Sequence, residues 1–293
     1  MIKILILTDF SEASRQAFTF ARSFFKDTVV DFHLLSVFPP EDDGFYGLKH
    51  NNKSAEQATT DQLQVIVDQL HQQATTDRHT FRASAQSGHP LDAVERAVAT
   101  EDYDYVVIGP QTNGINELFG NNAIALVHRL KANILIVPAD DLTETSACRF
   151  VLAIDFANLK NASLLEPLKE LMTLKNASLE LLTIDTPDKD VIPPEQEAHI
   201  RHFLDPIRPT IARLSADSAK EGIDAYLVDH QVDLLITIPR RTELASLSAG
   251  HSISTSRLQA YTPAVPLLTL YDDGSDDLPH LLLDELSNSN YTR

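Results

Sequence analysis

Residues 105–130 read YVVIGPQTNGINELFGNNAIALVHRL, the most informative stretch of the sequence. It opens with an apolar run typical of a buried strand and closes with a helix-like run. Between them lie Gly109, Gly114 and Gly120, three of the nine glycines in the chain. Glycine is needed where the backbone turns sharply or lies against a ligand, because a Cβ would clash there. A glycine-rich junction between a strand and a helix also directs free N–H groups and a positive helix end at one point, which suits a phosphate.

Outward from this junction, strand-like and helix-like segments alternate. In the first half of the chain we expect strands at 2–7, 32–38, 80–87, 104–108 and 133–138. We expect helices at 12–25, with Ser11 as the N-cap, and at 54–78, 90–101 and 121–130. Strands that alternate with helices predict an α/β fold with a parallel, doubly wound sheet of five strands.

The same pattern begins again after a polar, strand-poor stretch at 139–148. Residues 149–155 read RFVLAID and match KILILTD at 3–9. Further strands are expected at 179–184, 210–214, 233–239 and 264–270, with helices at 194–205 and 217–229. The chain is therefore predicted to hold two tandem domains of one fold, followed by an acidic tail, with limits at 1–140, 148–272 and 273–293.

The composition excludes several classes of function. The 293 residues carry 42 acidic and 24 basic side chains, a formal net charge of −18. Such a charge repels nucleic acids and anionic membranes, so neither is an expected partner. Cys148 is the only cysteine, which excludes an intrachain disulfide and fits a reducing compartment. The N-terminus lacks the pattern of a signal peptide, and no apolar run is long enough to span a bilayer. We expect a cytoplasmic protein.

Doubly wound sheets bind ligands beyond the carboxyl ends of the strands, where the strand order reverses. In a five-stranded sheet the first and fourth strands end at this point, so Asp9 is expected to lie close to Gly109. Asp9 is a candidate acceptor of hydrogen bonds from a ribose or an adenine amine, and the glycine loop is a candidate phosphate site. Thr8 and Val37 are expected to line a pocket for the flat base.

At these residues the chain resembles a known family. A strand, Thr-Asp-Phe-Ser and a helix, followed later by Gly-x4-Gly-x5-Gly-Asn-Asn, a helix and Ile-Leu-Ile-Val-Pro, resemble a universal stress protein domain. The second half resembles the same domain in degenerate form, so residues 1–272 look like a tandem universal stress protein of bacteria. The resemblance implies an adenine nucleotide alpha hydrolase-like fold and a non-enzymatic role in the stress response.

The resemblance also implies partners. In the family the fifth strands meet at a dimer interface, and a tandem chain can form this contact within itself as a pseudo-dimer. A homodimer of two such chains is a further expectation. Members with the full motif Gly-x2-Gly-x9-Gly-Ser/Thr bind ATP, which implies ATP with Mg²⁺ as the ligand here. The implied nucleotide-binding residues are Thr8, Asp9, Val37, Gly109, Gly114, Gly120, Asn121 and Asn122.

The glycine loop departs from the ATP-binding motif in three ways. Its spacing is shorter, so that the second glycine of the motif would fall at Thr112. Asn121 stands where a hydroxyl residue usually follows, and no lysine or arginine occurs from Gly109 to Val127. Two alternatives therefore stay open beside nucleotide binding. One is a partner-binding scaffold whose glycines only permit a tight loop, and the other, ranked lowest, is a weak ATPase.

The second half keeps Asp155 at the position of Asp9 but has lost the glycines. Its loop at 239–252 reads PRRTELASLSAGHS, in which Gly250 is the only glycine. Arg240 and Arg241 could contact an anion through their charge. Solvation, or pairing with the many acidic groups of the chain, is the preferred interpretation.

Other sequence patterns are weaker indications of a functional site. His199 and His202 lie near two glutamates on an expected helix, but a polar helix surface is preferred over a metal site. The sequence has no Gly-x-Ser-x-Gly elbow and no Gly-x4-Gly-Lys-Ser/Thr loop. We therefore expect no catalytic residues, no metal site and no enzymatic activity.

Overall fold

The computed structural model describes residues 1–39, 53–73, 78–109, 126–127, 129–138, 148–157, 159, 161–187, 194–239 and 265–272. The strands are β1 (Ile2–Leu7), β2 (Val30–Phe38), β3 (His79–Ser87), β4 (Tyr105–Ile108), β5 (Asn133–Ile136), β6 (Arg149–Ala153), β7 (Ser178–Asp185), β8 (Thr210–Ser215), β9 (Leu234–Thr237) and β10 (Leu267–Thr269). The helices are α1 (Glu12–Phe24), α2 (Lys53–Gln72), α3 (Pro90–Thr100), the short 3-10 helix η1 (Ala162–Leu165), α5 (Glu166–Lys175), α6 (Pro194–Phe203) and α7 (Ala219–Asp229).

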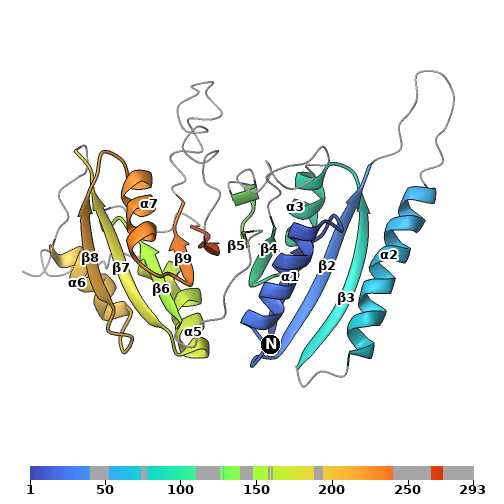
Figure 1. The fold of residues 1–293 in the computed structure, drawn as a ribbon, viewed down its shortest axis with the longest axis horizontal. Helices are drawn as coiled ribbons and strands as arrows, with labels where there is room; N and C mark the ends of the chain where they lie inside the picture. Colours follow the sequence, from blue (N-terminus) through green and yellow to red (C-terminus); the bar gives the residue numbers. More distant parts are fainter. Residues whose placement is uncertain are drawn as a thin grey trace, which may run out of the picture.

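All these strands belong to one sheet in the order β3-β2-β1-β4-β5-β10-β9-β6-β7-β8 (Figure 1). Each half of the sheet is parallel and has the same order, with its first strand between its second and fourth. In the first half, Ile4 and Ile6 of β1 share a core cluster with α1 and α2, while Leu5 and Leu7 share the other cluster with α3. Helices therefore cover both faces, which confirms the expected α/β, doubly wound architecture.

Most of the expected elements lie within a few residues of their predicted positions. The sequence pattern did not predict η1 and α5, which carry Leu165, Leu168 and Leu171 into the core. Pro167 lies in the first turn of α5, where a missing N–H breaks no helical hydrogen bond. Most of the helix expected at 121–130, the stretch 139–147 and the acidic tail at 273–293 lie outside the described residues.

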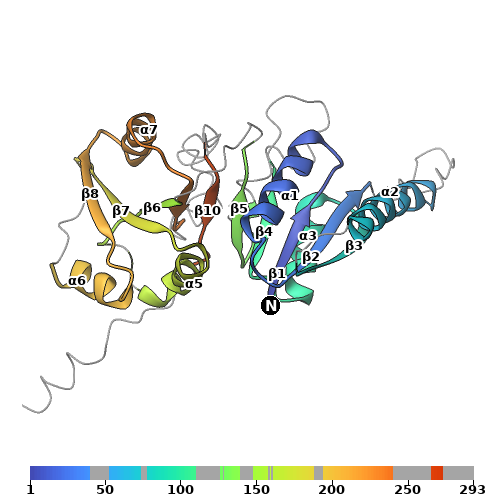
Figure 2. The same ribbon diagram turned by 60° about the horizontal axis from the view of Figure 1, so that its bottom comes forward.

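The two halves of the sheet are joined by β5 and β10, which pair antiparallel. Ile134, Leu135 and Ile136 lie opposite Thr269, Leu268 and Leu267, respectively. All other neighbouring strands in the sheet are parallel. The fifth strands thus meet within one chain, as expected for a pseudo-dimer, and they lie at the centre of the molecule (Figure 2).

Side chains join the two halves on one face of the sheet. Phe24, at the end of α1, stacks on Phe150 of β6, with ring centroids 6.2 Å apart and an interplanar angle of 26°. The ammonium group of Lys175 lies 4.3 Å from the centre of the Phe24 ring and donates a hydrogen bond to the Phe24 carbonyl. The junction between the halves is therefore a packed interface as well as a row of backbone hydrogen bonds.

One aspartate fixes the start of the first strand in each half. The Lys3 amide donates to Asp104 Oδ2 at 2.8 Å, and the Asp104 amide donates to the Lys3 carbonyl at 2.9 Å. In the second half, the Arg149 amide donates to Asp233 Oδ2 at 2.7 Å, and the Asp233 amide donates back at 3.0 Å. The first strand of each half is therefore fixed by the same pair of hydrogen bonds.

The N-terminal ends of β2 and β3 carry a charged network. Arg82 bonds to Asp31 at 3.1 Å and to Glu101 at 2.7 Å, and Lys3 reaches the other oxygen of Glu101 at 3.1 Å. His33 lies beside this network and is only 8% exposed. Burial, together with the positive charge of Arg82, lowers the pKa of His33 to about 4.

This lowered pKa predicts a loss of stability in mild acid. As the pH falls from about 6.5 towards 4, the unfolded chain binds a proton at His33 that the folded chain does not bind. The free energy of unfolding should therefore fall over this window, by up to about 1.4 kcal/mol per pH unit from this group. Urea unfolding at several pH values measures it, with His33→Gln as the control. Equal slopes for the two proteins would contradict the prediction.

The packed interface between the halves predicts a large effect for one buried ring. Phe150 is fully buried against Phe24, so Phe150→Ala leaves a cavity and should reduce the free energy of unfolding by about 3–5 kcal/mol. Val228→Ala is the matched control, because Val228 is 85% exposed and its loss should cost less than about 0.5 kcal/mol. Similar urea midpoints for both variants would show that the Phe150 contact is not a stabilising one.

Candidate functional site

The expected site lies where the strand order of the first half reverses, between β1 and β4. These neighbours are in parallel register, with Ile6 opposite Val107. Continuing this register places Thr8 opposite Gly109, so both residues lie at the carboxyl edge of the sheet. Of the expected site residues, the structure thus brings together Thr8, Asp9 and Gly109.

Hydrogen bonds fix the turn from β1 into α1. The Ser11 amide donates to Asp9 Oδ1 at 3.0 Å, and the Phe10 amide donates to the Thr8 hydroxyl at 3.1 Å. Phe10 takes the left-handed conformation, with a φ of 63°. Ser11 then accepts a bond from the Ser14 amide at 3.2 Å and caps α1 as expected. Asp9 is therefore held in one orientation at the edge of the sheet.

The Asp9 carboxylate is only half-buried. Its Oδ1 is used within the turn, while its Oδ2 accepts no hydrogen bond from the described residues. A fixed carboxylate with one free oxygen is suited to accept hydrogen bonds from the hydroxyl or amine groups of a ligand.

The packing of β4 against α1 explains why residue 109 is a glycine. A Cβ at this position would lie 2.1 Å from the carbonyl oxygen of Ala13 in α1, far inside van der Waals contact. The end of β4 can approach α1 this closely only because residue 109 has no side chain. Gly109 is therefore required for strand–helix packing whether or not a ligand binds.

The remaining expected residues divide into two groups. Val37 lies in β2 with only 4% of its surface exposed, in the same apolar cluster as Leu7, Ile108 and Val94. Contact between Val37 and a base stays a prediction. The other expected residues lie outside the described part of the chain: Gly114, Gly120, Asn121 and Asn122.

Arg129 is the first basic residue in the sequence after Gly109, and it is engaged in ion pairs. Its guanidinium donates to Asp92 at 2.9 Å and to Glu95 at 2.5 Å, both on α3. These carboxylates raise the pKa of Arg129 and offset its charge. Arg129 is therefore a poor source of positive charge for a phosphate bound near Gly109.

The second half repeats the aspartate turn, but the helical segment after the turn begins later. The Ala157 amide donates to Asp155 Oδ1 at 3.3 Å, as the Ser11 amide does to Asp9. In the first half α1 begins at Glu12, three residues after Asp9, whereas in the second half the next helical segment among the described residues, η1, begins at Ala162. Arg240 and Arg241 lie outside the described residues.

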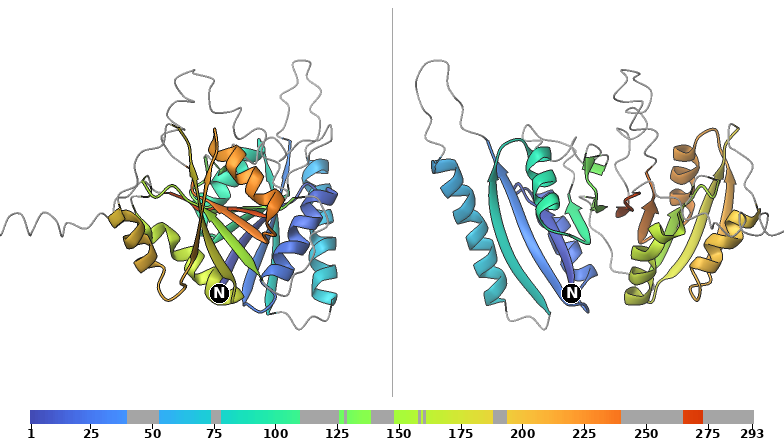
Figure 3. Two further views of the ribbon diagram at one scale, coloured as in Figure 1. Left: turned by 60° about the vertical axis from the view of Figure 1, so that its left-hand side comes forward. Right: turned by 180° about the vertical axis from the view of Figure 1, so that it is seen from behind.

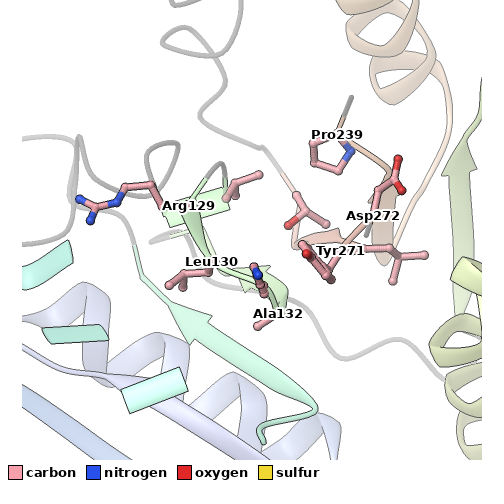
Figure 4. Close-up of a pocket in the computed structure, with 10 residues that line it drawn as sticks. Arg129, Leu130, Ala132, Pro239, Tyr271 and Asp272 are labelled. Carbon is pink, nitrogen blue, oxygen red and sulfur yellow. The ribbon is translucent and has the colours of Figure 1, made fainter. Parts of the chain in front are cut away.

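A small pocket lies at the junction of the two halves (Figure 4). Its volume is about 110 Å³, and its lining includes Leu130 and Ala132 from the first half and Pro239 and Tyr271 from the second. Pockets for ligands of nucleotide size occupy roughly 300–1,000 Å³. Figure 4 also shows that the guanidinium of Arg129 points away from this space. The pocket does not fit a nucleotide.

Two further observations concern metal sites and membrane-spanning helices. In the described part of the chain, no group of three or more His, Cys, Asp or Glu side chains is placed to bind a metal ion. His202, one of the two histidines noted in the sequence, lies 3.3 Å from Asp205. None of the helices that the structure describes is long and apolar enough to cross a membrane.

The close approach at Gly109 gives a testable consequence. Gly109→Ala places a methyl group against the backbone of Ala13, so it should reduce the free energy of unfolding by about 1–3 kcal/mol or more. Ser87→Ala, on the exposed end of β3, should change it by less than about 0.5 kcal/mol. Chemical denaturation measures both. A Gly109→Ala protein as stable as the parent would show that the packing of α1 on β4 is looser than described.

Comparison with known proteins agrees with this geometry. The model of the universal stress protein family matches residues 1–138. A universal stress protein from Archaeoglobus fulgidus DSM 4304 superposes with a TM-score of 0.66 at 16% identity, covering 92% of this chain and 97% of its own. A putative universal stress protein from Pseudomonas aeruginosa UCBPP-PA14 gives a TM-score of 0.53 at 13% identity, covering 98% and 97%.

At these identities the solved structures show a shared fold over nearly the whole chain. No curated protein sequence matches the chain. The family match covers the half that contains Thr8, Asp9 and Gly109. Residues 1–138 therefore form a unit similar to the universal stress protein family.

Proposed function

We propose that the first half of this protein binds an adenine nucleotide at the carboxyl ends of β1 and β4, with ATP and Mg²⁺ as the expected form. The observation that carries the proposal is the fixed, half-buried Asp9 carboxylate, which keeps Oδ2 free of hydrogen bonds from the described residues. It lies at the reversal of strand order, where doubly wound sheets bind their ligands.

In this proposal the protein is not an enzyme but acts in the stress response in the cytoplasm. Asp9 accepts hydrogen bonds from the ribose or the adenine amine, and the glycine loop after Gly109 surrounds the phosphates. Because this loop carries no lysine or arginine up to Val127, backbone N–H groups and Mg²⁺ neutralise the triphosphate. Nucleotide binding alters how the two halves pack, so the protein is a sensor.

The proposal assigns one nucleotide to each chain. Asp155 repeats the turn of Asp9, but the loop after Pro239 has lost the glycines, and the helical segment described after Asp155 begins only at Ala162. The second half then serves as a structural partner for the first.

A second candidate function is a partner-binding scaffold without a nucleotide. The ion pairs of Arg129 with Asp92 and Glu95 favour it, as does the burial of Val37. A weak ATPase ranks third. Phosphate release from ATP that disappears in Gly120→Val would support the ATPase.

A direct experiment separates the first two candidates. The purified full-length protein is denatured, and the supernatant is chromatographed for released nucleotide. If none is released, ATP with Mg²⁺ is titrated into the protein in a calorimeter. Absence of heat at millimolar ATP would reject nucleotide binding and leave the scaffold.

The repeated aspartate turn provides a matched pair of variants. Asp9→Asn keeps an oxygen for the Ser11 amide but removes the charge, so the Kd for ATP should rise about 10- to 100-fold, as for one lost charge-assisted hydrogen bond. Asp155→Asn makes the same change in the second half and should leave the Kd unchanged. Equal effects of the two variants, measured by calorimetry, would reject a site in the first half.

A further inference from the structure

A continuous chain of hydrogen bonds crosses the face of β2 and β3 away from the nucleotide site. Ser84 Oγ lies 2.7 Å from His33 Nε2, and His33 Nδ1 lies 2.5 Å from the Tyr103 hydroxyl. The Tyr103 hydroxyl lies 3.2 Å from Glu101 Oε2. These four residues, the Ser84 relay, come from β3, β2 and the segment that precedes β4.

The chemistry of each group fixes the direction of the relay. The Glu101 carboxylate can only accept, so the Tyr103 hydroxyl donates its single proton to it. The Tyr103 oxygen must then accept a hydrogen bond from His33 Nδ1–H. Because a neutral imidazole carries one N–H, His33 Nε2 is an acceptor, and the Ser84 hydroxyl donates to it.

The surroundings keep His33 in this form. The ring is buried, and the nearby guanidinium of Arg82 disfavours a positive charge on the imidazole, so His33 is neutral before the reaction. The network next to the relay holds two positive side chains, Lys3 and Arg82, and two negative ones, Asp31 and Glu101. The charges of these four side chains cancel one another.

Ser84 lies at the edge of the sheet and is less buried than the other members of the relay on β2 and before β4. It lies on β3, the outermost strand of the first half, and is only partly buried, whereas His33 and Tyr103 are in the interior. Figure 3 shows β3 next to α2, at the outer end of this half of the sheet. The partly buried Ser84 hydroxyl is thus followed by a buried base and two residues that orient this base, the arrangement found around activated nucleophiles.

We propose that Ser84 is a nucleophile that becomes acylated by uncharged, activated acyl donors. Ser84 Oγ attacks the acyl carbon and passes its proton to His33 Nε2. The bond between the acyl carbon and the leaving group breaks, and His33 returns the proton to the departing oxygen or sulfur. One acyl group is transferred to each chain, which is a modification of the protein and is independent of nucleotide binding.

The structure also sets the class of donor. The relay supplies a general base but no charge for the leaving group, so the donor must carry a leaving group that departs readily, as in an activated ester or a thioester. The cancelled charges around the relay give no attraction to an anionic donor. An uncharged acyl donor fits both conditions.

The full-length protein and p-nitrophenyl acetate test the proposal. Release of p-nitrophenolate gives the rate, and mass spectrometry of peptides locates the acetyl group. We expect one acetyl group at Ser84, lost in Ser84→Ala and retained in Ser87→Ala, whose serine lies exposed on the same strand. Acetylation of Ser84 no faster than that of Ser87 would overturn the proposal.

Two variants test whether the relay causes the reactivity. His33→Gln removes the base and should slow acetylation of Ser84 about a hundredfold or more. Tyr103→Phe keeps the ring but removes the hydroxyl that orients His33, and it should slow the reaction less. Circular dichroism verifies that each variant is folded. If His33→Gln does not fold, the test rests on Tyr103→Phe. An unchanged acetylation rate in the folded Tyr103→Phe protein would show that the relay does not cause the reactivity of Ser84.

Discussion

The antiparallel hydrogen bonds between β5 and β10 hold the architecture together. They join two parallel half-sheets of the same strand order into one sheet, and they bring β6 close enough for Phe150 to stack on Phe24. Without this pairing, each half would present an apolar edge strand with unpaired backbone groups to water. The burial of the central strands therefore depends on the contact between the halves.

Within this frame the two halves share the same scaffold and differ at one surface. Asp104 and Asp233 fix the first strands in equal ways, and the turns at Asp9 and Asp155 share one hydrogen bond. The difference begins just after these turns, where α1 follows Asp9 directly and η1 starts late after Asp155. This difference lies at the edge where ligands bind such sheets, whereas the strands below are held by packing.

The sequence predicted the parts of the structure that depend on local pattern. Apolar runs identified the strands, and the order of elements implied that Asp9 would lie close to Gly109. It did not predict α5, because Pro167 interrupts the helical pattern of the sequence although it is tolerated in a first turn. The packing role of Gly109 depends on the distance to Ala13, and the Ser84 relay joins residues up to 70 positions apart, so neither leaves a local signal.

The union of both halves in one chain has a consequence for how the protein can change over generations. In a dimer of identical subunits every substitution appears twice, so a change that harms one copy of a site harms the other as well. Here the strands β5 and β10 that meet are encoded separately, and each can vary while the other stays constant. Covalent linkage also keeps the two strands together at any dilution. The second half could therefore lose its glycine loop while the shared sheet stayed intact.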